Sequence, residues 1–281
     1  MGLRRQASRA RLWWPVLLVL GACATLQPGY VDDRFIIENH GNFTAQEVQR
    51  VRKELSIGLD AIEHLLGTIP AQKFPVVVHL RAGRGVSHIE HGQGPIELYW
   101  VREVQAPIIH ELTHVLVGYT AAHGHWTQEG LASYLQDHYG EDTAFPTRKM
   151  AHTLAKVIRD EHSQLPMLEV MQDRNRQRYF GVKTPWHRWL AYTQSTSLCQ
   201  YVIDTYGMDT FLRLYDQPLE AIDFPQLLGK RPEELVADWE VHLSHLEVDT
   251  TRAHYVFTML HTQLRETGGL GGTSDRRSGR R

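Results

Sequence analysis

Cysteine is scarce in this sequence: Cys23 and Cys199 are the only two among 281 residues. Cys199 lies in an apolar stretch with helical periodicity, where a buried thiol is expected and a nucleophile is not, so a cysteine protease is disfavoured. The sequence also lacks a phosphate-binding glycine motif, a C-x-x-C pair and any long internal repeat. Nothing in these patterns therefore indicates a nucleotide site, a dithiol site or a repeat architecture.

The apolar run near the N-terminus, from Leu12 to Ala22, is shorter than the roughly 20 residues that a membrane-spanning helix needs. Four arginines and no acidic residue precede it, and this pattern predicts an export signal over residues 1–22. Leu20-Gly21-Ala22-Cys23 resembles the lipobox of bacterial lipoproteins, which implies that Cys23 becomes the lipid-modified first residue, leaving Cys199 without a disulfide partner. Ordinary cleavage after Ala24 is the alternative. With a lipobox, Ala24 implies the outer membrane of a bacterial cell envelope, facing the periplasm.

The rest of the chain has no excess of basic residues. Four of the 30 Lys and Arg fall in residues 1–22, so 26 basic side chains remain against 32 acidic ones, a formal charge of −6. A protein of this charge without a basic stripe has no electrostatic footprint for nucleic acid, and binding to DNA or RNA is not expected.

Several strands are predicted in the first half of the chain, after a tether over residues 23–30. Arg34 to Glu38 and the valine-rich Phe74 to Leu80 indicate strands, and His79 is expected to be a packed or rim residue, not a metal ligand. Four glycines between Gly83 and Pro95 predict a mobile loop. Ile96 to Val101 is expected to be an edge strand onto which an extended peptide could add.

Helices account for most of the remaining pattern. A capping box at Thr44 and Glu47 predicts a helix that runs to about Gly67. From Phe145 onward the pattern is helical with short breaks, so the predicted class is α+β, with a small mixed sheet followed by a mainly helical C-terminal half. The expected parts are a signal peptide at 1–22, a tether at 23–30, an N-terminal subdomain at 31–143, a helical subdomain at 144–248, a peripheral helix at 249–266 and a disordered tail at 267–281.

The segment from Ala106 to Tyr119 contains His110, Glu111 and His114 in the pattern H-E-x-x-H. On a helix, residues four apart lie on the same face, so the two imidazoles can reach one metal ion and Glu111 can reach a water molecule beside it. The opposite face of this helix is expected to be apolar and buried, with Ile108, Ile109, Leu112, Val115, Leu116 and Tyr119.

A catalytic zinc site has three protein ligands and one open position, so a third ligand is expected nearby. Glu129 is the candidate, on a second helix that Thr127 is expected to cap, with Glu129 in its first turn. His123 and His125, in the turn between the helices, compete for this role, and His125 is the fallback. A helix holds a ligand more rigidly than a turn that contains glycine, which favours Glu129.

With both segments in view, the chain resembles the gluzincins, and in particular the bacterial peptidase-MA-like proteins. The resemblance rests on H-E-L-T-H at 110–114 and W-x-x-E-G-L-A-x-Y at 126–134, with weaker support from Y-x-Q-S at 192–195. It implies one Zn²⁺ per chain bound by His110, His114 and Glu129, and Glu111 as general base. It also implies a zinc metallopeptidase acting on a peptide or protein substrate, which here would be in the cell envelope.

Two points of the resemblance leave residues open. These enzymes need a donor for the tetrahedral oxyanion, which Tyr192 is expected to provide, with His187 and Tyr179 as alternatives. Thermolysin-like enzymes also carry an acidic residue four positions after the ligand glutamate, where this chain has Ser133, so the residue that orients a ligand histidine is unassigned. A catalytically inactive zinc-binding lipoprotein that acts as a scaffold is the alternative function, and a lipoprotein without metal is a third.

Overall fold

The chain is represented by a computed structural model that describes residues 29–89, 94–120, 122–140, 144 and 146–269. The predicted signal peptide and the lipobox cysteine, Cys23, lie outside these residues. Tyr30 already belongs to a strand, so the predicted tether at 23–30 is one residue too long. Among the residues described, no helix has both the length and the apolar character needed to cross a membrane.

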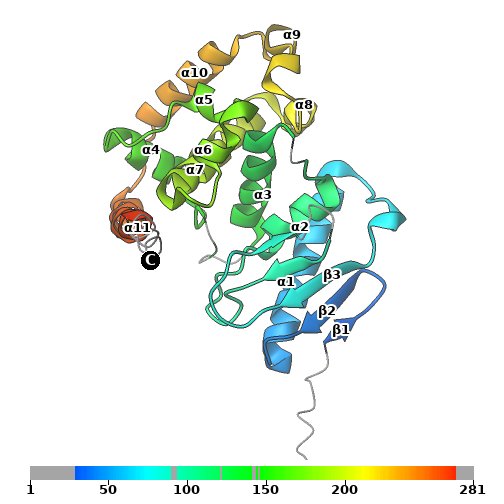
Figure 1. Cartoon of the computed structure of the whole chain (residues 1–281). Coiled ribbons are helices and arrows are strands. Elements are labelled where there is room, and N and C mark those ends of the chain that lie inside the picture. The colour runs from blue at the N-terminus through cyan, green and yellow to red at the C-terminus, as the bar shows by residue number, and fades with distance from the viewer. Residues whose placement is uncertain (1–28, 90–93, 121, 141–143, 145, 270–281) are drawn as a thin grey trace, which may run out of the picture.

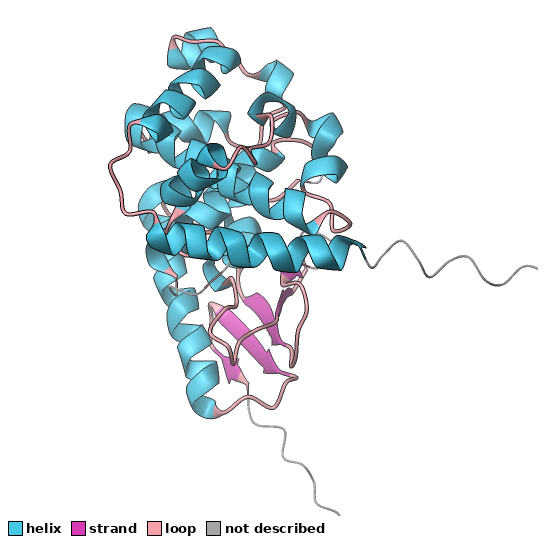
Figure 2. Cartoon of the chain, turned by 90° about the vertical axis from the view of Figure 1, so that its left-hand side faces the viewer, coloured by secondary structure: helices cyan, strands magenta, loops and turns pink. Residues whose placement is uncertain are grey.

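One mixed sheet lies at one end of the molecule, and helices fill the rest (Figure 2). Its strand order is β1-β2-β3-β5-β4. β2, β3 and β5 are parallel, while β1 and β4 pair antiparallel at the two edges. The strands are β1 (Tyr30–Val31), β2 (Phe35–Asn39), β3 (Val76–Leu80), β4 (His88–Ile89) and β5 (Ile96–Leu98).

Two predictions about this sheet are wrong. The glycine-rich segment 83–95 is not only a loop, because its residues His88 and Ile89 form β4. β5 is therefore an inner strand between β3 and β4, and the edge strand on this side of the sheet is β4. The short β4 was not recognisable because two residues among glycines carry too little alternation to predict a strand.

The long helix α1 (Ala45–Leu66) covers one face of the sheet (Figure 1). The predicted capping box is confirmed: the Thr44 hydroxyl accepts from the Glu47 backbone N–H, and the Glu47 carboxylate accepts from that of Thr44 at 2.7 Å. Alternation along the strands sends one set of side chains towards the helix. This inner set is buried and consists of Phe35, Ile37, Val76, Val78, Leu80, Ile96 and Leu98.

The helical part begins with the two helices that carry the sequence motifs, α2 (Ile108–Val117) and α3 (His125–Tyr139). The central helix is α7 (Pro185–Tyr206), which packs against α3, α4, α8 and α11. The other helices are α4 (Ala151–Asp160), α5 (Met167–Val170), α6 (Arg176–Tyr179), α8 (Met208–Leu214), α9 (Phe224–Leu228), α10 (Pro232–Ser244) and α11 (Thr251–Gly269). The architecture is thus α+β, as expected.

A close crossing of α3 and α7 joins the helices that form the site. A methyl group on Gly130 would lie 2.3 Å from Cys199 Sγ and 2.9 Å from the Ser195 carbonyl oxygen, so only glycine allows this approach. Cys199 is fully buried, as predicted, and burial raises the pKa of its thiol well above the usual value.

The apolar core continues from the sheet through this crossing into the helical part. The predicted subdomains 31–143 and 144–248 therefore share one core. The predicted peripheral helix at 249–266 corresponds to α11, which extends through Gly269 and so includes the first residues of the predicted tail. The remainder of that tail, from residue 270, lies outside the described residues.

Candidate metal centre

Helices α2 and α3 bring three buried side chains together. His110 Nε2 lies 3.1 Å from His114 Nε2, and the Glu129 Oε2 atom lies 3.2 Å from the first nitrogen and 3.4 Å from the second. All three side chains are at most 7% exposed. The structure therefore brings the three residues that were predicted as metal ligands, His110, His114 and Glu129, together in one cluster.

The spacing of these atoms can be compared with that of a zinc site. Zinc binds imidazole nitrogen and carboxylate oxygen at roughly 2.0–2.2 Å, so tetrahedral geometry separates its ligand atoms by about 3.3–3.5 Å. The three separations in the cluster lie between 3.1 and 3.4 Å. The residues present fit a tetrahedral divalent cation with three protein ligands.

The charge of Glu129 agrees with this arrangement. Burial opposes its ionisation, yet His114 and His110 together hold the pKa of the carboxyl well below its usual value. A buried carboxylate that faces two imidazole nitrogens is costly unless a cation compensates it.

One face of α3 supports the cluster through residues spaced at helical intervals. Four residues after Glu129, the Ser133 hydroxyl lies 3.2 Å from His110 Nδ1. One turn further, the Gln136 side-chain oxygen accepts from the backbone N–H groups of Ile109 and His110 at 2.8 and 3.1 Å. Gln136 thus takes the place of a capping side chain for α2, because the N-cap residue, Pro107, has no side-chain oxygen that could accept from these amides. The orienting group for His110 is therefore a hydroxyl, Ser133, in place of an acid.

The beginning of α3 differs from the prediction. The cap is Gly124, in the left-handed region with φ of 69°, and α3 begins at His125. Thr127 lies inside the helix, where its hydroxyl donates to the Gly124 carbonyl at 2.8 Å and accepts from the Asp216 N–H at 3.1 Å. Glu129 consequently falls in the second turn. Thr127 has a side chain that often caps helices, but the short connection from α2 makes α3 begin earlier, at His125.

The two turn histidines do not join the cluster. His123 Nδ1 lies 3.3 Å from the Asp216 carboxylate, outside the group that can hold a metal. His125 packs its ring against Tyr119 and Phe180, and burial lowers its pKa to about 4. The choice of Glu129 over His125 as the third member of the cluster therefore agrees with the structure.

Glu111 is buried beside the cluster and lines the adjoining cleft. Burial raises the pKa of its carboxyl to about 7, with a smaller increase from the Glu129 charge and an opposing effect of His110. A carboxyl that titrates near neutrality can accept and return a proton under ordinary conditions.

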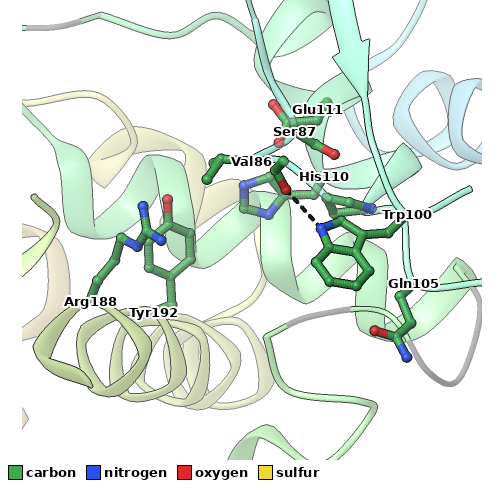
Figure 3. Close-up of a pocket in the computed structure, with 10 residues that line it drawn as sticks. Val86, Ser87, Trp100, Gln105, His110, Glu111, Arg188 and Tyr192 are labelled. Atoms are coloured by element: carbon green, nitrogen blue, oxygen red, sulfur yellow. Dashed lines mark hydrogen bonds between the residues drawn. The ribbon is translucent and has the colours of Figure 1, made fainter. Parts of the chain in front are cut away.

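The cleft consists of two adjoining cavities of about 240 and 220 Å³ that share six lining residues. Figure 3 shows Arg188 and Tyr192, both from α7, on one side and Trp100 and Gln105 on the other, with His110 and Val86 between them. The Trp100 indole N–H donates to the Gly85 carbonyl at 2.7 Å, which fixes the glycine-rich segment against the rim of the cleft. Both edge-strand residues, His88 and Ile89, line the second cavity.

Two tyrosines flank the histidine pair. The Tyr192 ring stacks on His110 at 5.9 Å between centroids, and burial raises the pKa of its hydroxyl well above the usual value, so it stays protonated. Tyr119 was expected on the apolar face of α2, but α2 ends at Val117, and Tyr119 turns back to contact His114 edge-on at 4.7 Å.

The alternatives to Tyr192 lie elsewhere. The Tyr179 hydroxyl donates to the Glu169 carboxylate at 2.6 Å, and His187 lines a separate cavity beside His162 and Leu190. Sequence reasoning missed Tyr119, Ser133 and Arg188. The signal for Arg188 was its spacing of four residues from Tyr192 on one helix, which places both on the same face.

Comparisons of this chain with protein-family models, with curated proteins and with solved structures found no match. A function must therefore be argued from the geometry of the cluster and its cleft.

Proposed function

We propose that this protein is a zinc-dependent metallopeptidase with a zincin-like arrangement of the gluzincin type. The observation that carries the proposal is the convergence of His110, His114 and Glu129 at ligand spacing, with the buried carboxyl of Glu111 beside them on a cleft. A zinc ion bound there would polarise a substrate carbonyl and lower the pKa of a water molecule towards 7.

The protein side chains then have separate tasks in hydrolysis. Glu111 accepts a proton from the attacking water and delivers it to the leaving amine, and its raised pKa suits both transfers. Tyr192 is the proposed hydrogen-bond donor to the oxyanion, because it is protonated and lines both cavities. With zinc on His110 Nε2, the His110 proton would be on Nδ1, where the Ser133 hydroxyl, 3.2 Å away, would accept it and orient the ring.

The edge strand indicates how a substrate binds. β4 pairs on one side with β5 and lines the cleft with His88 and Ile89. An extended peptide that adds to the other side of β4 places its backbone along the cleft, held by main-chain hydrogen bonds. The proposed substrate is therefore a peptide or an unstructured protein segment.

Replacement of the proposed base tests this function. Glu111→Gln should reduce hydrolysis of a peptide library by about 10²–10⁴-fold, because glutamine cannot accept the proton. Elemental analysis should still find zinc in the variant, since Glu111 is not one of the clustered ligands. Glu233→Gln, an exposed glutamate in α10, makes the same chemical change away from the cleft and should leave the rate unchanged.

Undiminished hydrolysis by Glu111→Gln would show that this residue is not the base. A zinc-loaded wild-type chain that cleaves neither varied peptides nor cell-envelope proteins would instead support the alternative, a zinc-binding scaffold.

We further propose that the protein is held in a bacterial cell envelope by a lipid on Cys23. The support is the basic and apolar N-terminal sequence that ends in Leu20-Gly21-Ala22-Cys23. Cys23→Ser should move the protein from the membrane fraction to the soluble fraction after cell fractionation, because several acyl chains anchor firmly and none would remain. Retention of the variant on membranes would indicate another attachment.

A further inference from the structure

A row of polar side chains crosses four strands on the face of the sheet opposite α1. The strand register places Glu38 of β2 beside His79 of β3, His79 beside Glu97 of β5, and Glu97 beside His88 of β4. Neighbouring residues in register point to the same face of a sheet, so acidic and imidazole groups alternate along this row.

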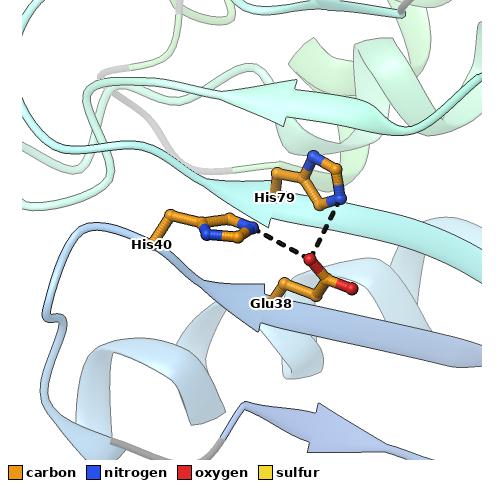
Figure 4. A group of neighbouring side chains, drawn as sticks. All are labelled: Glu38, His40 and His79. Atoms are coloured by element: carbon orange, nitrogen blue, oxygen red, sulfur yellow. Dashed lines mark hydrogen bonds and ion pairs between the residues drawn. The ribbon is translucent and has the colours of Figure 1, made fainter. Parts of the chain in front are cut away.

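His40 follows β2 directly and joins the row at Glu38 (Figure 4). The Glu38 Oε2 atom lies 2.9 Å from His40 Nε2 and 3.3 Å from His79 Nε2. The two imidazole rings meet edge to face with centroids 5.0 Å apart, and the three ligand atoms all lie within 4.8 Å of one another. The distance from Glu38 to His79 equals the separation of about 3.3–3.5 Å between ligand atoms in a tetrahedral zinc site, and the distance from Glu38 to His40 is shorter.

A buried carboxylate fixes the orientation of one of these imidazoles. Glu97 Oε1 accepts from His79 Nδ1 at 2.7 Å and from the Arg81 guanidinium at 3.1 Å, and the Glu97 side chain is 9% exposed. With a metal ion on Nε2, the His79 proton would be on Nδ1, where the Glu97 carboxylate could accept it.

We propose that Glu38, His40 and His79 form a second metal site, which binds a divalent transition-metal ion on the solvent-facing side of the sheet. Two imidazoles and one carboxylate suit zinc, copper or nickel better than magnesium or calcium, which take oxygen ligands. Glu97 is the positioning residue, because a ligand histidine that donates its other N–H to a carboxylate is the usual arrangement around bound metal. This site is independent of the proposed peptidase activity.

The sequence pattern alone gave no reason to treat His79 as a ligand. Its partner Glu38 belongs to β2 and His40 follows that strand, whereas Glu97 belongs to β5. Only the parallel pairing of β2, β3 and β5 places these side chains together.

Zinc titration of the full chain, purified in detergent without a polyhistidine tag, tests this site by calorimetry and elemental analysis. The wild type should bind two equivalents of Zn²⁺. The double variant His110→Ala/His114→Ala should bind one, and adding His79→Ala should remove the remaining saturable binding. His88→Ala, which removes an exposed imidazole from the same row, is the matched control and should change neither number.

Glu97→Gln should weaken the second equivalent by about 10–100-fold without removing it, because glutamine orients His79 less strongly. If the double variant does not fold, the count in a His79→Ala single variant decides, which should fall from two to one. The site would be refuted by a His79→Ala variant that binds as many zinc equivalents as the wild type. It would also be refuted if ¹⁵N spectra of the zinc-saturated chain showed protons on both His79 nitrogens, because the residue would then be an imidazolium bridge between Glu38 and Glu97.

Discussion

Among the residues that the structure describes, two groups consist of two histidines and one glutamate, and they lie in different surroundings. The group between α2 and α3 is buried, and its side chains are at most 7% exposed. The group on the sheet faces solvent, with Glu38 and His40 more than 40% exposed. Similar ligand chemistry is thus placed once in the core and once on the surface.

The difference between the two groups shows what separates a proposed catalytic centre from a site that only binds an ion. The buried group has a carboxyl with a raised pKa, Glu111, and a protonated phenol, Tyr192, on an adjoining cleft. The exposed group has an orienting carboxylate, Glu97, which the Arg81 hydrogen bond keeps ionised. A carboxylate with a pKa of about 2 cannot act as a proton acceptor near neutral pH.

The largest expected effect is the difference in peptide hydrolysis between a variant that loses a histidine from the buried group and one that loses a histidine from the exposed group. We expect His110→Ala to lose zinc at the buried group and to reduce peptide hydrolysis by roughly 10³-fold or more, because zinc supplies several kcal/mol of transition-state stabilisation. His79→Ala removes the same atoms from the exposed group and should change the rate less than about twofold, as expected for a group that shares no residue with the buried one. Zinc content and initial rates, measured on the same preparations, check both results. A large loss of activity in His79→Ala would mean that the two groups are coupled.

The next largest expected effect is a difference in kcat between variants of the two tyrosines beside the buried group, Tyr192 and Tyr119. Tyr192→Phe should reduce kcat by about 10²–10³-fold with zinc retained, because it removes the proposed donor to the oxyanion. Tyr119→Phe should cost less than about tenfold, because the Tyr119 hydroxyl is engaged with Arg176. Steady-state kinetics with one peptide compare the two variants. A reversed order of the two losses would assign the oxyanion donor to Tyr119.

The smallest expected effect concerns the groups that orient the histidines. Ser133→Ala removes the contact to His110 Nδ1 and should weaken zinc binding at the buried group by about 10–100-fold. Ser195→Ala removes the same hydroxyl from an equally buried position in α7, where it has no hydrogen-bond partner in the described part of the chain, and should leave affinity unchanged. Competition with a chelator measures both constants. Equal losses in the two variants would mean that the effect comes from packing and not from orientation.

The local features of the fold followed well from the sequence. The capping box of α1 and the helical character of the chain after Phe145 were predictable, because caps and helical periodicity depend on residues a few positions apart. The buried thiol of Cys199 also followed from its apolar neighbours. The edge strand β4 did not, since two residues become a strand only when β5 lies beside them.

The Y-x-Q-S pattern at 192–195 shows, within a single motif, how far the roles of residues can be predicted from the sequence. Gln194 holds the backbone of Leu165 with two hydrogen bonds, of 2.8 and 3.1 Å, and so has a structural role. Tyr192, two residues earlier, faces the cleft. The sequence could not separate these roles, because both residues lie on a helix that is surrounded by protein.

The sequence by itself determined the pair His110 and His114 with Glu111 between them, because a spacing of four residues on one helix sets their common face. It also determined which acid could complete the cluster, Glu129. Tertiary structure alone decided that α3 brings Glu129 within 3.4 Å of both imidazoles, that Ser133 lies beside His110 Nδ1, and that Tyr119 and Arg188 line the cleft. It alone also joined Glu38, His40 and His79 across two strands. The physical reason is that helix geometry acts over a few residues, whereas the packing of separate elements depends on the whole core.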